Sequence, residues 1–195
     1  SDYGASQISR ELQREMRSQV LHGTGLLMIG GWGSFSGPFG KWRGSVIEEL
    51  LPVRCLARDD RKNFPSGAWV IPNKKIVEKS KVLGGALGAF EFGQPPVICG
   101  LNEVQVKKSA KVLLWAQEIN KRGSRPVLGK KYPLLAIENQ MKTAAFMTDA
   151  APHWCGGLVD WGRTRRRLPV NSKIQVEVGS EYLRFFSNLF RWLAK

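Results

Sequence analysis

Few side chains in this sequence have the chemistry to move a proton or attack a substrate. The chain has two histidines, His22 and His153. His22 stands beside Gly23 at the end of a predicted helix, where a cation interacts favourably with the helix dipole, so His153 is the better functional candidate. Asp149 and Asp160 are the nearest acids, and either could orient the imidazole for acid–base work. A hydrogen-bonded histidine with a purely structural role explains His153 equally well.

The same residues could in principle hold a metal ion. His153, Asp149 and Asp160 offer nitrogen and oxygen donors that suit zinc, but their spacing matches no metal motif. The glycines at 30, 31 and 33 also lack the spacing of a dinucleotide or phosphate-binding loop. We therefore expect no metal and no cofactor.

A glycine-rich loop follows a short apolar run. Residues 26–29 are four large apolar side chains in succession, which is typical of a strand covered on both faces, as in a parallel sheet. Gly30, Gly31 and Gly33 then allow a sharp turn and a close backbone approach. Because ligands bind at the carboxyl ends of such strands, we expect Gly30 to Phe35, with Trp32 and Ser34, to line a site. A plain tight turn is the alternative.

The cysteines give information about the compartment. Cys55, Cys99 and Cys155 are far apart and lack the Cys-x-x-Cys spacing of zinc sites and redox motifs. This usage argues against a disulfide framework and fits a reducing compartment such as the cytoplasm. No apolar run approaches the roughly 20 residues that a membrane span needs.

Periodicity and turn residues predict a mixed α/β fold. Apolar residues at helical spacing predict helices over residues 6–21 and 46–51 and in the tail from Tyr182. Apolar runs predict strands at 26–29, at Val104 and Val106, and over 112–115, 134–138 and 143–149. Glycine, proline and polar residues predict loops or turns over 36–45, 123–131 and 152–157, and loops with short helical or extended pieces over 64–100.

Composition bounds the size and the partners. With 195 residues and 43% apolar content, the chain fits a single domain spanning residues 1–195. The formal charge of +14 makes nucleic acid or an anionic surface a possible partner. Arg163 and the arginines at 165–167 form the densest basic run, although a solvated basic surface explains them too.

Several stretches together resemble a known family. They are residues 26–35 (LLMIGGWGSF), 47–53 (IEELLPV), 58–61 (RDDR), 143–149 (TAAFMTD), 151–154 (APHW) and 156–162 (GGLVDWG). In this order they are similar to the bacterial family called putative glutamine amidotransferase, in the class I glutamine amidotransferase-like superfamily. The resemblance implies a flavodoxin-like three-layer α/β sandwich with its site at the strand ends. The chain opens inside a strand-to-helix turn, so we expect the family's N-terminal portion to be absent.

The resemblance also assigns the expected catalytic positions. Class I enzymes place a nucleophilic cysteine on a Gly-x-Cys-x-Gly elbow, activated by a histidine that an acid orients. Trp32 stands at that cysteine position, and an indole is not a nucleophile. His153 lies near the position of the catalytic histidine, but Trp154 and Cys155 follow it where those enzymes have proline and glutamate. Asp149 or Asp160 would then have to serve as the acid.

Three functions are compatible with these residues. The first is an amidotransferase-like domain without the cysteine nucleophile, which binds a small molecule or a protein through the loops of Trp32, His153 and Trp154. The second is an active amidotransferase or amide hydrolase, which requires Ser34 or a cysteine within hydrogen-bond reach of His153. The third is a binder of nucleic acid or of an anionic surface. We favour the first, and whether the protein is an enzyme is left open.

Overall fold

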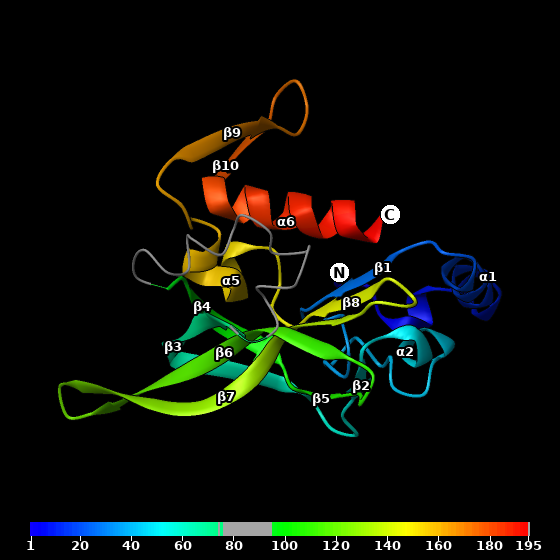
Figure 1. Cartoon of the computed structure of the whole chain (residues 1–195), viewed down its shortest axis with the longest axis horizontal. Helices are drawn as coiled ribbons and strands as arrows, with labels where there is room; N and C mark the ends of the chain where they lie inside the picture. Colours follow the sequence, from blue (N-terminus) through cyan, green and yellow to red (C-terminus); the bar gives the residue numbers. More distant parts are fainter. Residues whose placement is uncertain (74, 76–94, 195) are drawn as a thin grey trace.

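A computed structural model of the chain describes residues 1–73, 75 and 95–194. Its centre is a six-stranded sheet in the order β1-β8-β7-β6-β3-β4 (Figure 1). The expected mixed α/β fold class is confirmed. The strands are β1 (Leu26–Ile29), β3 (Arg61–Pro72), β4 (Val97–Asn102), β6 (Lys111–Arg122), β7 (Arg125–Glu138) and β8 (Thr143–Phe146).

The pair β1–β8 lies in the core beside the helices. β1 runs parallel to β8, with Met28 opposite Ala145, and β8 runs antiparallel to β7. All four residues of β8 are buried. The expectation that β1 is fully covered was wrong, because only Met28 of its four residues is buried. The cause is its position at the edge of the described sheet, where one side of the strand has no neighbouring strand.

Helices lie on both sides of β1 and β8. In Figure 1, α6 (Ser180–Leu193) lies on one side of this pair and α2 (Val46–Leu50) on the other. The rings of Phe185 and Phe186 on α6 contact Phe146 of β8 at centroid distances of 5.6 and 5.5 Å. This contact buries the apolar face of the predicted tail helix, which confirms that prediction.

The first helix, α1, spans Arg10–Leu21 and follows a 3-10 turn, η1 (Ala5–Gln7). Its cap is Ser9, whose hydroxyl accepts a hydrogen bond from the Leu12 amide, so the helix begins later than the predicted range 6–21. Ser45 caps α2 in the same way by accepting from the Glu48 amide. The expected helix at 46–51 is therefore confirmed, and it ends one residue early.

Two loop predictions were wrong because proline and glycine occur inside long strands. Within 64–100, β3 extends to Pro72 and β4 begins at Val97, while residues 76–94 lie outside the described part. β3 accommodates Pro65 through a bulge between Asn63 and Ala68. The expected turn at 123–131 has only two residues, because β7 begins at Arg125 with a proline in its second position.

The remaining elements are short. β2 (Val53–Cys55) pairs with β5 (Val104–Val106), so the strand at Val104 and Val106 does not pair with the strand that follows it. β9 (Arg165–Pro169) and β10 (Gln175–Gly179) form a second two-stranded ribbon. The predicted loop at 152–157 is the helix α5 (Pro152–Cys155) followed by η2 (Gly156–Leu158). None of the helices in the described residues is long and apolar enough to cross a membrane.

Candidate functional site at the end of β1

The glycine loop after β1 is held tightly against the end of β8. The amide of Gly30 donates to the carbonyl oxygens of Phe146 and Thr148 at 2.7 and 3.0 Å. A Cβ at position 30 would collide with the carbonyl oxygen of Met147. Gly31 has a φ of 141°, which L side chains rarely adopt. The glycines are therefore required by the close approach of two strand ends.

The loop does not lead into a helix. Turns continue from Gly31 to Gly44, and the next helix is α2 at Val46. Two residues with side chains have a positive φ in this loop: Phe35, at 46°, is fully buried, and Lys41, at 51°, lies ten residues beyond Gly31. A nucleophile elbow needs a strand, one strained turn and then a helix. The loop after β1 has a different geometry.

A buried pair of polar side chains, Asp60 and Asn102, holds this loop in place. Asn102, at the end of β4, accepts from the Gly31 amide at 2.9 Å and donates to the Gly31 carbonyl oxygen at 3.2 Å. Its amide group also donates to Asp60 Oδ1 at 2.8 Å, and Asp60 Oδ2 accepts from the Ser36 amide at 2.6 Å. Asp60 and Asn102 are completely buried. Together they connect β4, the glycine loop and the start of β3.

Asp60 is a residue that sequence reasoning misplaced. The 58–61 run is dense in charge, which is typical of the surface, and Arg61 does pair with Asp59 at 2.7 Å. Asp60, however, points into the core, where burial raises the pKa of its carboxyl group to about 6. Hydrogen bonds from Asn102 and Ser36 partly oppose this rise. No signal in the sequence distinguished the two neighbouring aspartates, and none pointed to Asn102.

Trp32 lies at the surface with a cation over its ring. Its side chain is 44% exposed, and the guanidinium carbon of Arg61 lies 4.4 Å from its ring centroid. Arg61 is held in place by hydrogen bonds from Nε and Nη2 to the Asp59 carboxylate. The ring of His153 lies 6.4 Å from the Trp32 ring. The structure thus brings Trp32, Arg61 and His153 together from three separate segments; we call them the Trp32–Arg61–His153 cluster.

Asp149 is the acid beside His153. Its Oδ2 lies 3.8 Å from His153 Nδ1, and the imidazole is mostly exposed. The carboxylate is buried and also accepts from the amides of Trp154 and Cys155, so it caps α5. Burial raises the pKa of Asp149, against the effect of these amides. Asp149 thus positions the helix that presents His153.

Asp160 and Trp154 serve other contacts. Asp160 is exposed and pairs with Arg165 of β9, and no described contact joins it to His153. The Trp154 side chain is buried; its Nε1 donates to Asn63 Oδ1 at 3.0 Å, and its ring covers Gly100 of β4. Trp154 therefore fastens α5 to β3 and β4 and does not line the surface near Trp32.

The potential nucleophiles lie in unreactive surroundings. Ser34 is buried, and its hydroxyl accepts from the Asp2 amide at 3.1 Å. Cys55 and Cys155 are buried, and burial raises the pKa of both thiols far above the usual range. Cys99 is exposed. In the described residues, none of these four forms a hydrogen bond with His153, and no group of three or more acids, histidines and cysteines could hold a metal ion.

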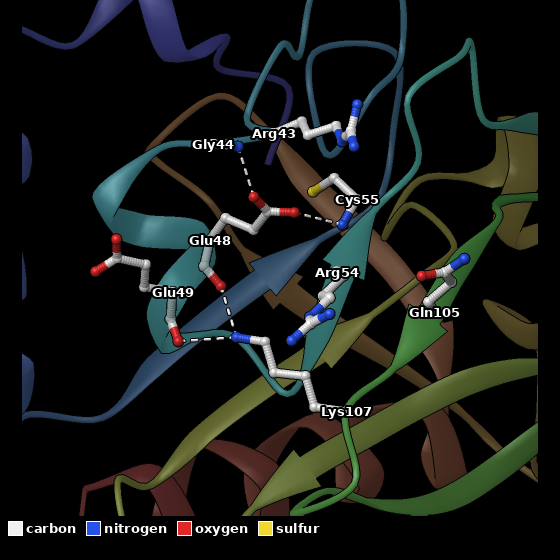
Figure 2. A pocket seen from close by; sticks show the side chains of 8 residues that line it. All are labelled: Arg43, Gly44, Glu48, Glu49, Arg54, Cys55, Gln105 and Lys107. Atoms are coloured by element: carbon white, nitrogen blue, oxygen red, sulfur yellow. Dashed lines mark hydrogen bonds between the residues drawn. The ribbon is translucent and has the colours of Figure 1, made fainter.

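A separate cavity of about 780 Å³ lies between α2, β2 and β5 (Figure 2). Glu48 organises it: its carboxylate accepts from the amides of Gly44 and Cys55. Lys107 donates to the carbonyl oxygens of Glu48 and Glu49 at 2.9 and 2.8 Å. These groups are engaged with one another and hold α2 against β2. Neither Trp32 nor His153 lines this cavity.

The chain is similar to a known protein family and to solved structures. The family model described as putative glutamine amidotransferase matches residues 2–173. A cytoplasmic protein from Salmonella typhimurium has a similar solved structure, with 25% identity and a TM-score of 0.71. A second, from strain LT2, has 23% identity and a TM-score of 0.70 and supports the fold alone. In each case the whole of this chain aligns with 70% of the other. No curated protein matches the sequence.

Proposed function

The chain belongs to the putative glutamine amidotransferase family, and we propose that it is a member without the usual cysteine nucleophile that binds a ligand or partner at the Trp32–Arg61–His153 cluster. The observation that carries the proposal is Trp32 itself. The indole occupies the expected nucleophile position and is exposed at the strand end instead of being packed away. An exposed tryptophan held under a cation is a binding feature more than a catalytic one.

The backbone after β1 supports the loss of the elbow. The class I enzymes that the sequence resembles present their nucleophile at one strained turn between a strand and a helix. Here a series of turns follows β1, and the two side-chain-bearing residues with a positive φ, Phe35 and Lys41, are a buried aromatic residue and a lysine. The buried thiols of Cys55 and Cys155 are protonated at neutral pH, because burial raises the pKa of each.

The chemistry of the cluster indicates the class of ligand. The Trp32 ring offers an apolar face, and His153 offers a hydrogen-bonding imidazole that is largely exposed. Nη1 of Arg61 forms no hydrogen bond with the described residues, whereas Nε and Nη2 bind Asp59. A ligand that carries a carboxylate or carboxamide beside a short apolar stem would match these groups. The two Salmonella proteins are described as cytoplasmic, which supports a cytoplasmic location here too.

The first test is ammonia release from L-glutamine by the purified chain and by its His153→Ala variant, with His22→Ala as the matched control. We expect all three proteins to stay at the background rate. Release that disappears only with His153→Ala would contradict the proposal.

A second function retains catalysis, and the proximity of His153 and Asp149 favours it. An acid beside an exposed imidazole is the part of a catalytic pair that this chain keeps. The nucleophile would then be Cys99, the one exposed thiol among the described residues. Under this alternative, Cys99→Ser would abolish ammonia release, whereas Cys55→Ser would not.

A further inference from the structure

The hairpin of β6 and β7 extends beyond the rest of the sheet. β3 pairs with β6 only as far as Glu118, and β8 pairs with β7 only from Leu135 onward. Residues 119–131 therefore pair only within the hairpin, where Lys131 is opposite Gln117 of β6 and the residues from Ile119 to Leu128 pair with each other, and Figure 1 shows the tip of the hairpin projecting from the molecule. We call residues 119–131 the basic ribbon. Nearly all of its side chains are exposed.

The basic ribbon carries positive charge that no acid balances. Five of its thirteen residues are cationic and none is acidic: Lys121, Arg122, Arg125, Lys130 and Lys131. None of the five forms an ion pair with a described residue. The ribbon of β9 and β10 differs, because Arg165 pairs with Asp160 and Glu177, and Arg167 pairs with Glu177. The densest basic run in the sequence is thus partly neutralised, and the unbalanced charge lies on the basic ribbon.

Two arginines at the tip face each other across the strands. Arg122 is directly opposite Arg125, so both project from the same face. Lys121, opposite Pro126, projects from the other face because side chains alternate along a strand. Like charges directly opposite one another destabilise a strand pair. Despite this repulsion, the ribbon presents cations on both faces. This arrangement suits a partner that surrounds the ribbon with negative charge.

We propose that the basic ribbon binds double-stranded DNA by entering its major groove. That groove admits a two-stranded β-ribbon, and phosphates line both of its walls. Cations on both faces of the ribbon can then reach phosphates of both strands. A membrane surface would contact only one face, and the deep, narrow major groove of RNA duplexes excludes a ribbon. This inference is independent of the function proposed for the Trp32–Arg61–His153 cluster.

The test measures binding of the full chain to a fluorescent 24-base-pair DNA duplex by anisotropy across a series of salt concentrations. The triple variant Lys121→Gln, Arg122→Gln, Arg125→Gln removes three charges from the tip. The control Arg163→Gln, Arg166→Gln, Lys173→Gln removes three exposed charges around the β9–β10 ribbon. We expect the tip variant to lose affinity at least about tenfold, with the slope of log K against log salt reduced by about 2–3. The control should stay within about twofold of wild type, and circular dichroism should confirm that both variants are folded.

Other outcomes would overturn the proposal. Equal losses in both variants would mean that net charge alone attracts DNA. Absence of DNA binding at low salt, with binding to anionic phosphatidylserine vesicles or to duplex RNA that depends on the tip, would assign the ribbon to a different partner.

Discussion

At the scale of single residues, the buried pair Asp60–Asn102 decides the shape of the candidate site. The two side chains accept hydrogen bonds from the backbone amides of Gly31 and Ser36, which lie in a loop outside any helix or strand. Neither residue is part of the exposed cluster. They act by holding the glycine loop in the position from which Trp32 projects.

Replacing Asn102 tests this positioning role. Asn102→Ala leaves the Gly31 amide and the Asp60 carboxyl group buried without their partner, so the free energy of unfolding should fall by about 2–4 kcal/mol. Asn120→Ala is the matched control, because Asn120 is exposed and its loss should cost under about 0.5 kcal/mol. Urea denaturation monitored by tryptophan fluorescence measures both. Equal effects would show that the buried amide does not hold the loop.

The raised pKa of Asp60 predicts a pH dependence of stability. Burial raises this pKa from 3.8 to about 6, so between these values the folded protein binds more protons than the unfolded chain. The contribution of Asp60 to stability is therefore present at about pH 4 and is lost as pH rises through 6.

Asp60→Asn removes this titration and isolates it. From pH 4 to pH 7, the free energy of unfolding of the wild type should fall relative to that of Asp60→Asn by up to about 3 kcal/mol. Urea titrations of both proteins at several pH values measure the shift. A difference that stays constant across this range would mean that Asp60 titrates in the folded protein as it does in the unfolded chain.

At the scale of elements, α6 packs its aromatic side chains against the sheet. Phe185 is 1% exposed and contacts Phe146, whereas Phe190 on the same helix is 52% exposed. Phe185→Ala should lower the free energy of unfolding by about 3–5 kcal/mol, and Phe190→Ala by far less, because only the first leaves a cavity. Thermal and urea unfolding compare the two substitutions. Similar costs would contradict the packing of α6 against β8.

Elements with one clear periodicity could be predicted from the sequence. The tail helix has a broad apolar face, and the segments at 26–29 and 143–149 are apolar runs beside glycine or a turn, so they were identified correctly. β3 and the first part of β7, before the predicted strand at 134–138, were missed because prolines interrupt their patterns, and a bulge or an exposed ribbon tolerates these prolines. Which strands pair could not be predicted from local sequence patterns either, because paired strands such as β2 and β5 are separated by about 50 residues in the chain.

At the scale of the whole molecule, the site is an assembly of distant segments. Asp149 was one of the two acids expected beside His153, and its proximity to His153 follows from a short separation across the start of α5. The contact of Trp32 with Arg61 and His153 depends on how the end of β1, the start of β3 and the helix α5 come together. Local sequence patterns do not show which distant segments come into contact, so Arg61 was overlooked as a site residue.

Charge is also distributed at this scale. The formal charge of +14 suggested the arginine run at 165–167 as the basic surface, but its local acids pair with two of these arginines. The sequence alone did not identify the unbalanced cations of the basic ribbon, because the strand pairing is needed to show that residues 119–131 form one exposed hairpin tip. The two proposed activities thus occupy different parts of the molecule and can be tested separately.

The most direct test of the central claim is saturation-transfer NMR with L-glutamine labelled with ¹⁵N at its side-chain amide. The account predicts transfer from the protein to glutamine, loss of that transfer in Trp32→Ala, and no labelled ammonium during hours of incubation. Trp69→Ala is the matched control, because Trp69 lies on β3 away from the cluster, and transfer should persist in it. Labelled ammonium that accumulates with the wild-type protein, or transfer that persists unchanged in Trp32→Ala, would contradict the account.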